Sequence, residues 1–350
     1  MTALARLLHD RIAADGPIGV DLFMALCLGH PEHGYYRKQD PLGAKGDFTT
    51  APEVSQMFGE MIGLWLAETW DALGRPDPVA LVELGPGRGT LMADILRVAR
   101  AVPGFAEAVQ VHLVETSPAL RARQKEALGD RQVRWHDHVE TLPDMPLLLV
   151  ANEFFDALPI RQFQKTDLGW QERRIASDGV SFRFTLGPAV QQDPALLIEP
   201  EGRILETCPA GEAIAANTGA RIAAQGGAAL WIDYGAEDGL GDTLQALRDH
   251  KPEPVFAHPG DADLTAHVRF KPLAAAAAPA RATPVTTQGH FLERLGITAR
   301  AQALAAARPD RSAAIASEHR RLTHPAEMGN LFKVQAVTSL APDRLAGFAP

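Results

Sequence analysis

A glycine-rich loop follows an apolar stretch in the first third of the chain. The run Val79–Val82 leads into Glu83-Leu84-Gly85-Pro86-Gly87-Arg88-Gly89, with glycine at every second position. Glycine permits tight turns and leaves the backbone bare, so that a ligand can lie against it. The spacing differs from the G-x-G-x-x-G of dinucleotide loops, because Thr90 stands where that pattern has its third glycine.

The acidic residue before the loop indicates which ligand the loop takes. Glu83 at the end of a predicted strand would repel a phosphate, but it suits a ligand that carries a cation and hydroxyl groups. S-adenosylmethionine has both. The alternative is an ordinary strand–turn–helix with a glycine-rich turn. We predict an E-x-G-x-G-x-G cofactor loop made of Glu83, Gly85, Pro86, Gly87, Gly89 and Thr90.

Two further acidic residues close predicted strands. Glu115 ends the strand Val109–Glu115, where doubly wound nucleoside sites use a carboxylate to accept hydrogen bonds from ribose hydroxyls. Asp137 follows the strand Gln132–His136, where such a fold can meet the adenine amino group. We predict that both bind the cofactor. Either could instead be a solvated carboxylate at a strand end.

A fourth predicted strand, Leu147–Ala151, ends in Asn152-Glu153-Phe154-Phe155-Asp156. The carboxyl ends of parallel strands form the ligand crevice of such sheets. A guanidinium pairs with carboxylates and stacks on aromatic rings, so this segment suits a cationic acceptor. We predict that Glu153 and Asp156 orient the nucleophile. Alternatively, the phenylalanines pack in the core and Asp156 caps the next helix.

Methyl transfer from a sulfonium depends mainly on the alignment of nucleophile, methyl carbon and sulfur. We therefore expect no catalytic metal and no covalent nucleophile. The twelve histidines include no H-E-x-x-H motif. Cys27 and Cys208 form no C-x-x-C pair, and we expect them to be free thiols.

Strands and helices alternate from Val79 onward, which predicts an α/β fold with a doubly wound parallel sheet. Hairpins are expected within 163–184, and the last strand, 331–340, is expected at an antiparallel edge. Helices are expected at 3–14, from a cap at Asp21 to Leu28, and at 53–73. We divide the chain into an N-terminal helical and lid region, 1–75, and a domain, 76–350, with insertions at about 160–207 and 236–330.

The composition excludes some classes of partner. The 350 residues carry a net charge of −9, which argues against a nucleic-acid partner. No apolar run reaches the length of a membrane helix. Met1–Gly16 lacks the apolar core of a signal peptide and is too acidic for a mitochondrial presequence. We expect a cytoplasmic protein, bacterial by its Ala-, Arg- and Pro-rich composition; its oligomeric state stays open.

Several longer motifs together resemble the MidA-like family, in which a mitochondrial complex I assembly factor is a protein arginine methyltransferase. They span nearly the whole chain in family order. The most specific are Gly46–Ser55 and Asn152–Pro159. The other matching segments are Gly34–Tyr36, Phe58–Glu60, Glu83–Met92, Val114-Glu115 before Ser117, Asp233–Gly235, Thr265–Val268, Thr287-Gln288 and Met328–Val334.

The resemblance implies a seven-stranded class I methyltransferase sheet with an N-terminal helical extension and inserted substrate-side elements. It implies S-adenosyl-L-methionine as the cofactor and symmetric dimethylation of an arginine in a respiratory complex I subunit. It places Glu153 and Asp156 near the reacting centre. It also adds a probable lid and a strand-end amide to the cofactor site: Gly46, Asp47, Phe48, Thr49, Thr50 and Asn152.

One residue departs from the family pattern. An acidic residue is expected two positions after His267, where this chain has Arg269. If that carboxylate grips a cationic substrate, the protein prefers another substrate or works poorly; if it forms a surface pair, little changes. Three alternatives stay open: a methyltransferase acting on a small molecule, a non-catalytic assembly factor that binds S-adenosylmethionine, and a nicotinamide enzyme, which the glycine spacing disfavours.

Overall fold

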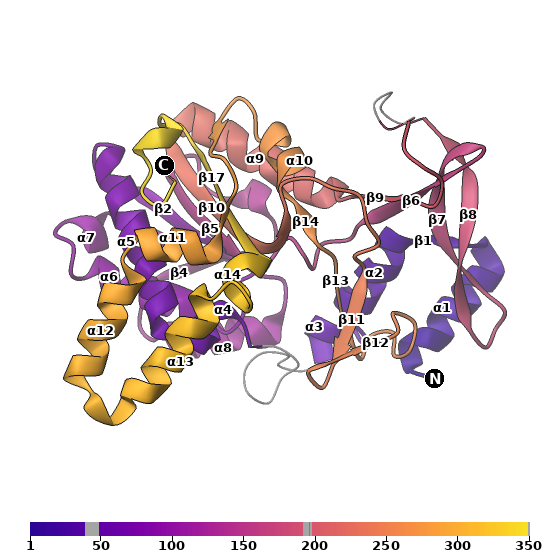
Figure 1. Ribbon diagram of the computed structural model, residues 1–350, viewed down its shortest axis with the longest axis horizontal. Coiled ribbons are helices and arrows are strands. Elements are labelled where there is room, and N and C mark those ends of the chain that lie inside the picture. The colour runs from indigo at the N-terminus through magenta and orange to yellow at the C-terminus, as the bar shows by residue number, and fades with distance from the viewer. Residues whose placement is uncertain (39–48, 192–195, 197, 349–350) are drawn as a thin grey trace. The chain divides into compact units, whose positions relative to one another are not determined.

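Figure 1 shows the computed structural model of the protein, which describes residues 1–38, 49–191, 196 and 198–348. The chain forms two compact units, each described by itself below. Unit 1 comprises Met1–Phe48, Asp156–Glu212 and Asp238–Arg269, and unit 2 comprises Thr49–Phe155, Ala213–Glu237 and Phe270–Pro350. The boundaries of these units differ from the boundary predicted at residue 75. The division into two domains at that residue stays a prediction.

Unit 2 is built on a mainly parallel sheet, as predicted. Its strands follow the order β15-β17-β10-β5-β2-β3-β4, in which β10, β5, β2, β3 and β4 are parallel neighbours and β17 is antiparallel to β10. All six residues of β2 are buried, as expected for a strand covered on both faces. The strands are β2 (Val79–Leu84), β3 (Val109–Val114), β4 (Val133–His136), β5 (Leu147–Asn152), β10 (Gly227–Ala236), β15 (Arg281–Ala282), β16 (Thr286–Thr287) and β17 (Phe332–Thr338).

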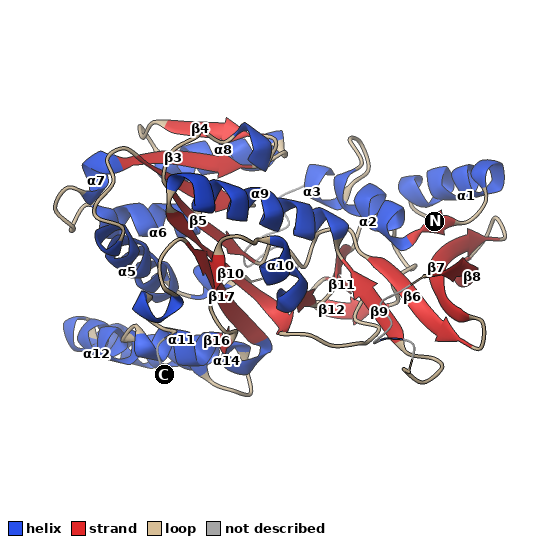
Figure 2. Ribbon diagram, turned by 90° about the horizontal axis from the view of Figure 1, so that it is seen from above, coloured by secondary structure: helices blue, strands red, loops and turns tan. Residues whose placement is uncertain are grey.

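The helices of unit 2 cover this sheet. Helix α6 buries Leu91, Met92, Ile95, Leu96 and Ala99, a helical spacing that places one apolar face on the core. Helices α5 and α6 lie side by side in both ribbon views (Figure 2). The helices are α4 (Ala51–Val54), α5 (Gln56–Ala72), α6 (Thr90–Ala99), α7 (Phe105–Ala108), α8 (Pro118–Leu128), α10 (Phe270–Ala276), α11 (Gln288–Arg294), α12 (Ile297–Ala307), α13 (Ser312–Thr323), α14 (Met328–Leu331), and α9 (Pro209–Gln225), which begins in unit 1.

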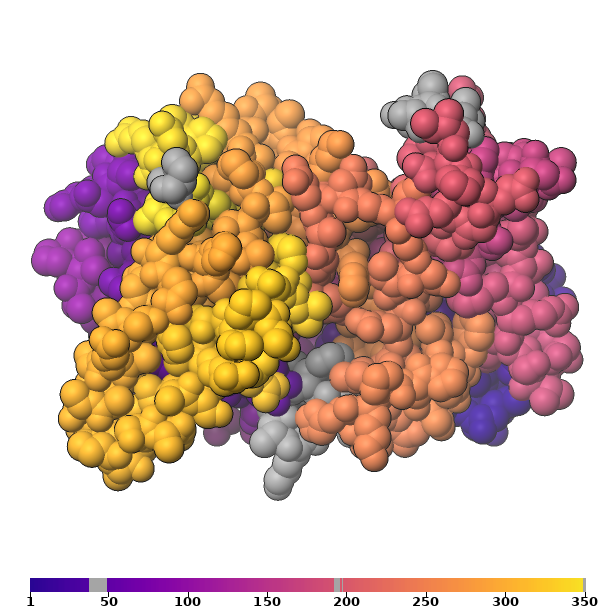
Figure 3. Space-filling model, in the orientation of Figure 1, coloured from indigo at the N-terminus to yellow at the C-terminus, as the bar shows by residue number. Residues whose placement is uncertain are grey.

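Three short 3-10 turns complete unit 2: Val139–Thr141, Pro309–Arg311 and Pro342–Arg344. Helices α12 and α13 pack on each other and form part of the surface seen in orange in Figure 3. Within the described ranges, no helix is long and apolar enough to cross a lipid bilayer.

Two predictions about unit 2 are wrong in detail. The helix expected at 53–73 is two helices, because Ser55 is extended (φ −162°) and its hydroxyl accepts from the amide of Met57 to cap α5. The last strand is antiparallel but is not the edge of the sheet. The short strands β15 and β16 pair with the side of β17 that faces away from β10.

Unit 1 combines helices with two small sheets. One sheet has the order β1-β7-β6-β9 with β8 beside β7, and it contains the hairpins that were predicted; the other has the order β12-β11-β13. The helix expected to be capped by Asp21 instead begins after Gly19, and Asp21 lies in its first turn. The elements are α1 (Ala3–Asp15), β1 (Ile18–Gly19), α2 (Val20–Gly29), α3 (Tyr35–Lys38), β6 (Arg161–Thr166), β7 (Gly169–Ser177), β8 (Phe182–Val190), β9 (Ile204–Thr207), β11 (Gln245–Arg248), β12 (Lys251–Glu253), β13 (Asp263–Thr265) and β14 (Val268–Arg269).

Candidate active site

The glycine loop connects β2 to α6 in unit 2. Gly85, Gly87 and Gly89 have φ values of 59°, 52° and 84°, a region that favours glycine. A Cβ atom on Gly85 would lie 2.7 Å from the ring of Phe154, so a side chain does not fit there. The carbonyl of Pro86 accepts a hydrogen bond from the amide of Gly89 at 2.8 Å, which closes the turn. The loop therefore presents backbone rather than side chains where the helix begins.

Glu83 lies inside the core rather than on the surface of the loop. Its side chain is buried, and burial raises its pKa to about 8, although a hydrogen bond from the backbone of Met92 lowers it in part. Within the described part of the chain, its Oε2 atom has no hydrogen-bond partner. An unpartnered buried carboxyl oxygen is costly, and a cationic group nearby would favour its ionised form.

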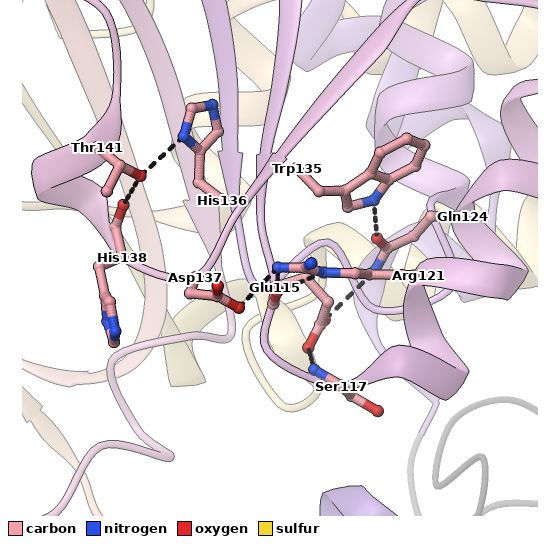
Figure 4. Close-up of polar contacts among 9 residues, drawn as sticks. All are labelled: Glu115, Ser117, Arg121, Gln124, Trp135, His136, Asp137, His138 and Thr141. Carbon is pink, nitrogen blue, oxygen red and sulfur yellow. Dashed lines mark hydrogen bonds and ion pairs between the residues drawn. The ribbon is translucent and has the colours of Figure 1, made fainter.

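Glu115 directly follows β3 and is 9% exposed. Its Oε1 accepts from the amide of Ser117 at 2.7 Å and its Oε2 from Nε2 of Gln124 at 3.3 Å (Figure 4). Burial raises its pKa, while these donors and the charge of Arg121 lower it. The carboxylate is therefore fixed in place by neutral donors on one side.

Asp137 and Glu115 share a hydrogen-bond donor, Arg121. Arg121 of α8 donates to the backbone carbonyl of Glu115 at 2.8 Å and to Oδ1 of Asp137 at 2.9 Å (Figure 4). The side chain of Asp137 is 66% exposed, so a ligand can reach it. The structure thus brings together both carboxylates that the sequence predicted for a nucleoside, and it adds Arg121 and Gln124, which the sequence analysis missed.

The end of β5 holds Asn152 and Glu153. Glu153 has a φ of 51°, which is strained for a residue with a side chain. Its Oε1 accepts from the amide of Ala51 at 2.9 Å and from Nδ2 of Asn152 at 3.0 Å. Among the described residues, the buried Oδ1 of Asn152 has no partner. Strain and an unpartnered acceptor at one strand end are typical of a ligand site.

The buried Asp233 of β10 fixes the neighbouring turn, and the sequence analysis gave it no role. Its Oδ2 accepts from the backbone amides of Phe154 and Phe155 at 3.1 and 2.9 Å. The ring of Phe155 also packs edge-on against Trp231. Asp233 therefore holds Phe154 against the glycine loop.

Helix α4 contacts the loop through Glu53. The hydroxyl of Thr90 donates to Oε1 of Glu53 at 2.6 Å, and Arg88 lies 4.0 Å from its Oε2. Thr49 and Thr50 are half-buried, and Thr50 begins α4 without a side-chain capping bond. The predicted residues Gly46, Asp47 and Phe48 lie outside the described residues.

Asp156 belongs to unit 1, whereas Glu153 belongs to unit 2. Asp156 is 7% exposed, and its backbone carbonyl accepts from the amide of Ala266. In the same unit, the hydroxyl of Tyr36 donates to Oδ1 of Asp263 at 3.1 Å. Burial first, and then the charges of Asp263 and Asp156, hold the pKa of Tyr36 well above its usual value. Asp156 does not cap a helix; it lies in a buried acidic cluster made of Tyr36, Asp156 and Asp263.

Arg269, the departure from the family pattern, has defined partners within unit 1. Its guanidinium donates to the backbone carbonyl of Glu206 at 2.8 Å and forms an ion pair with Asp238 at 2.5 Å. The two side chains are 22% and 40% exposed. Arg269 therefore forms a partly exposed ion pair in this chain.

Comparison with known proteins adds to this geometry. Residues 61–288 match a family model of S-adenosyl-L-methionine-dependent methyltransferases. The chain is 36% identical over 97% of its length to the mitochondrial protein arginine methyltransferase NDUFAF7 of Danio rerio, of which the match covers 87%. It is 36% identical over 99% of its length to human NDUFAF7, of which the match covers 85%.

Solved structures agree. A COG1565 superfamily member from Burkholderia thailandensis, bound to S-adenosyl-homocysteine, has a TM-score of 0.85 and 30% identity, and the match covers 99% of this chain and 93% of that one. A native structure from the same organism has a TM-score of 0.84 and 32% identity over 98% and 94% of the two chains. The predicted α/β methyltransferase fold with a mainly parallel sheet and the predicted cofactor are confirmed.

The prediction of a cytoplasmic bacterial protein is wrong. The curated relatives from Danio rerio, Mus musculus and Drosophila melanogaster are mitochondrial proteins. The location was predicted from the residues of Met1–Gly16 and the bacterial source from the bulk composition. The fold, the glycine loop and nearly full-length matches agree with one another. The chain therefore belongs to the MidA-like family of S-adenosyl-L-methionine-dependent methyltransferases.

Proposed function

We propose that the glycine loop of unit 2 binds S-adenosyl-L-methionine and that the enzyme methylates an arginine of a protein. The observation that carries the proposal is the bare backbone of Gly85–Gly89 beside the buried carboxylate of Glu115. This backbone forms a cradle in which Gly85 has no room for a side chain, because a Cβ atom there would lie 2.7 Å from the ring of Phe154. Among the described residues, one buried oxygen each of Glu83 and Asn152 has no partner, and these residues lie at the ends of the two adjacent strands. The residues present fit the cofactor.

Each described residue has a proposed part in binding. Glu115 accepts hydrogen bonds from the ribose hydroxyls, and Asp137 accepts from the adenine amino group. The backbone of Gly85–Gly89 supports the nucleoside, while Glu83 and Asn152 favour its cationic end. We also propose that Thr49 and Thr50 contribute to the cofactor site. When bound, the cofactor supplies an electrophilic methyl group on a sulfonium.

Glu153 and Asp156 are proposed to orient the acceptor. The acceptor nitrogen of the arginine side chain must face the methyl carbon, and a carboxylate can fix its direction and its charge. The amide of Ala51 and Nδ2 of Asn152 hold Oε1 of Glu153 at 2.9 and 3.0 Å, so this carboxylate is itself oriented before substrate binds. Asp156 is buried in unit 1, and its charge, like that of Asp263, acts on the phenol of Tyr36.

The relatives named protein arginine methyltransferases support a protein arginine as the acceptor. The resemblance to the MidA-like family supports a respiratory complex I subunit as the protein. The chain's net charge of −9 is compatible with a basic target segment.

The test is transfer of a labelled methyl group from S-adenosylmethionine into a cell lysate, separated into protein and metabolite fractions. We expect label in protein, with mass spectrometry placing it on arginine. We also expect Glu153→Gln to lose about 100-fold in rate while S-adenosylhomocysteine binds within about tenfold of wild type. Label in metabolites alone would favour the small-molecule alternative. Cofactor binding without any transfer would favour the non-catalytic one.

A further inference from the structure

Gln124 of α8 contacts three parts of the cofactor site at once. Its side chain is fully buried. Its Nε2 atom donates to the carbonyl of Gly87 at 2.8 Å and to Oε2 of Glu115 at 3.3 Å. Its Oε1 atom accepts from the indole Nε1 of Trp135 at 2.8 Å. Figure 4 shows Gln124 between Trp135 of β4 and the carboxylate of Glu115.

Trp135 determines which way the amide points. The two ends of a glutamine amide have nearly the same shape but opposite hydrogen-bonding character, so its partners decide its orientation. An indole N–H can only donate, and therefore Oε1 must face Trp135. A carbonyl and a carboxylate can only accept, so Nε2 must face Gly87 and Glu115. All three contacts agree on one orientation.

We propose that Trp135 and Gln124 are positioning residues for the cofactor, forming a relay that fixes the glycine loop and the ribose-binding carboxylate relative to each other. Besides the backbone hydrogen bond from the amide of Gly85 to the carbonyl of Val114 at 3.0 Å, one side-chain amide contacts both the carbonyl of Gly87 and the carboxylate of Glu115. This proposal rests on the proposed function, in which Glu115 binds the ribose. It adds that the relative position of the loop and the carboxylate depends on Gln124 of α8 and on Trp135 of β4.

The relay has a consequence for pH dependence. The amide of Gln124 lowers the pKa of Glu115 against the effect of burial. Without the amide, this pKa rises, and an ionised acceptor for ribose hydroxyls is lost at higher pH than in wild type. The charge of Arg121 also lowers the pKa of Glu115. Arg121 and the titratable neighbours His136 and Asp137 are the same in the wild type and in a Gln124 variant, so a difference between their pH profiles comes from the amide.

The test compares three variants by calorimetric titration with S-adenosylhomocysteine across pH. Gln124→Met removes the amide and keeps the length of the side chain. Trp135→Phe removes the orienting N–H donor together with one ring of the side chain, and it serves if Gln124→Met does not fold. Gln335→Met is the matched control, because Gln335 is also a buried amide, whose Nε2 donates to the carbonyl of Thr283 at 3.0 Å away from the loop.

We expect Gln124→Met to bind S-adenosylhomocysteine about tenfold more weakly than wild type and Trp135→Phe about threefold more weakly. As the pH is lowered, Gln124→Met should begin to lose affinity at a higher pH than wild type. Gln335→Met should lower the melting temperature but leave the affinity within about twofold of wild type. Wild-type affinity and pH profile in both Gln124→Met and Trp135→Phe would overturn the relay. Failure of the wild-type protein to bind S-adenosylhomocysteine at all would instead overturn the proposed function.

Discussion

Buried carboxylates have different surroundings in the two units. In unit 2, Glu115 accepts from the amide of Ser117 and from Gln124, and Arg121 lies beside it. In unit 1, Asp156 and Asp263 lie near one phenol, that of Tyr36, whose pKa both carboxylates raise. The first carboxylate accepts from a backbone amide and a side-chain amide, whereas the second pair of carboxylates lies around a phenol.

This difference indicates what each region is suited to bind. A carboxylate fixed by neutral donors keeps acceptor positions for hydroxyl groups without needing a cation. Two carboxylates near each other disfavour the ionisation of both unless a cation joins them. We propose that the carboxylate of unit 2 serves a nucleoside and that the acidic cluster of unit 1 serves a guanidinium. Variants in both units test this distinction.

The largest effect is expected from Gly85→Ala. Alanine at a φ of 59° is strained, and its Cβ atom would lie 2.7 Å from the ring of Phe154. Strain and overlap together predict a loss of about 1,000-fold in affinity for S-adenosylhomocysteine, measured by calorimetry. Gly129→Ala is the control, since its φ is 61° with nothing near its Cβ position. Equal losses in both variants would mean that destabilisation, not the cradle, is the cause.

Asp156→Asn should separate turnover from cofactor binding. Removing the charge is expected to lower kcat by about 100-fold while S-adenosylhomocysteine binds within about threefold of wild type. Glu115→Gln should do the reverse and weaken S-adenosylhomocysteine by about 30-fold, because a charged acceptor becomes neutral. If both variants lose affinity equally, the proposed division of roles between the two units fails.

Glu83 should make the cofactor-free protein less stable as pH rises. Its pKa in the folded state is about 8, compared with 4.5 in the unfolded chain, so the folded state holds the proton more tightly. The stabilisation is present below the unfolded pKa and is lost as pH rises through the folded pKa. We expect the free energy of unfolding to fall by roughly 2 kcal/mol between about pH 6 and pH 8.

Chemical denaturation of wild type and Glu83→Gln over this pH range measures the effect. The variant should lack most of the decrease, because glutamine does not ionise. The same dependence of the unfolding free energy on pH in both proteins would show that Glu83 is already ionised at neutral pH.

The smallest effect is expected from Arg269→Gln. Its ion pair with Asp238 is partly exposed, and such pairs contribute about 1 kcal/mol or less. Methyl transfer and S-adenosylhomocysteine affinity should both stay within about twofold of wild type. A large loss of turnover alone would instead give Arg269 a part in substrate recognition.

Much of the fold follows from local pattern. The strands of the parallel sheet and the helix α6 have strong apolar periodicity, and the glycine loop has a fixed spacing, so these could be located from the sequence. The break at Ser55 could not, because a serine hydroxyl that caps a helix looks the same in sequence as one inside it. The strands β15 and β16, which pair with β17 on the side away from β10, are another case, since two-residue strands carry no periodic signal.

The candidate site was located only in part for a related reason. Carboxylates at strand ends are visible in sequence, because the topology of a parallel sheet predicts where they lie. Arg121 and Gln124 were missed because polar residues on a helix usually indicate a solvated face, and only the packing of α8 shows that this face is buried against the loop. Asp233 was visible as part of a family motif, but its hydrogen bonds to two backbone amides depend on the fold.

The central claim is that the nucleoside of the cofactor lies on the backbone of the glycine loop with its ribose on Glu115. A crystal structure of this protein with S-adenosylhomocysteine tests it most directly. The account predicts density along Gly85–Gly89, with both ribose hydroxyls within about 3 Å of the carboxylate of Glu115. A nucleoside bound elsewhere, or a loop filled by a side chain at saturating ligand, would contradict it.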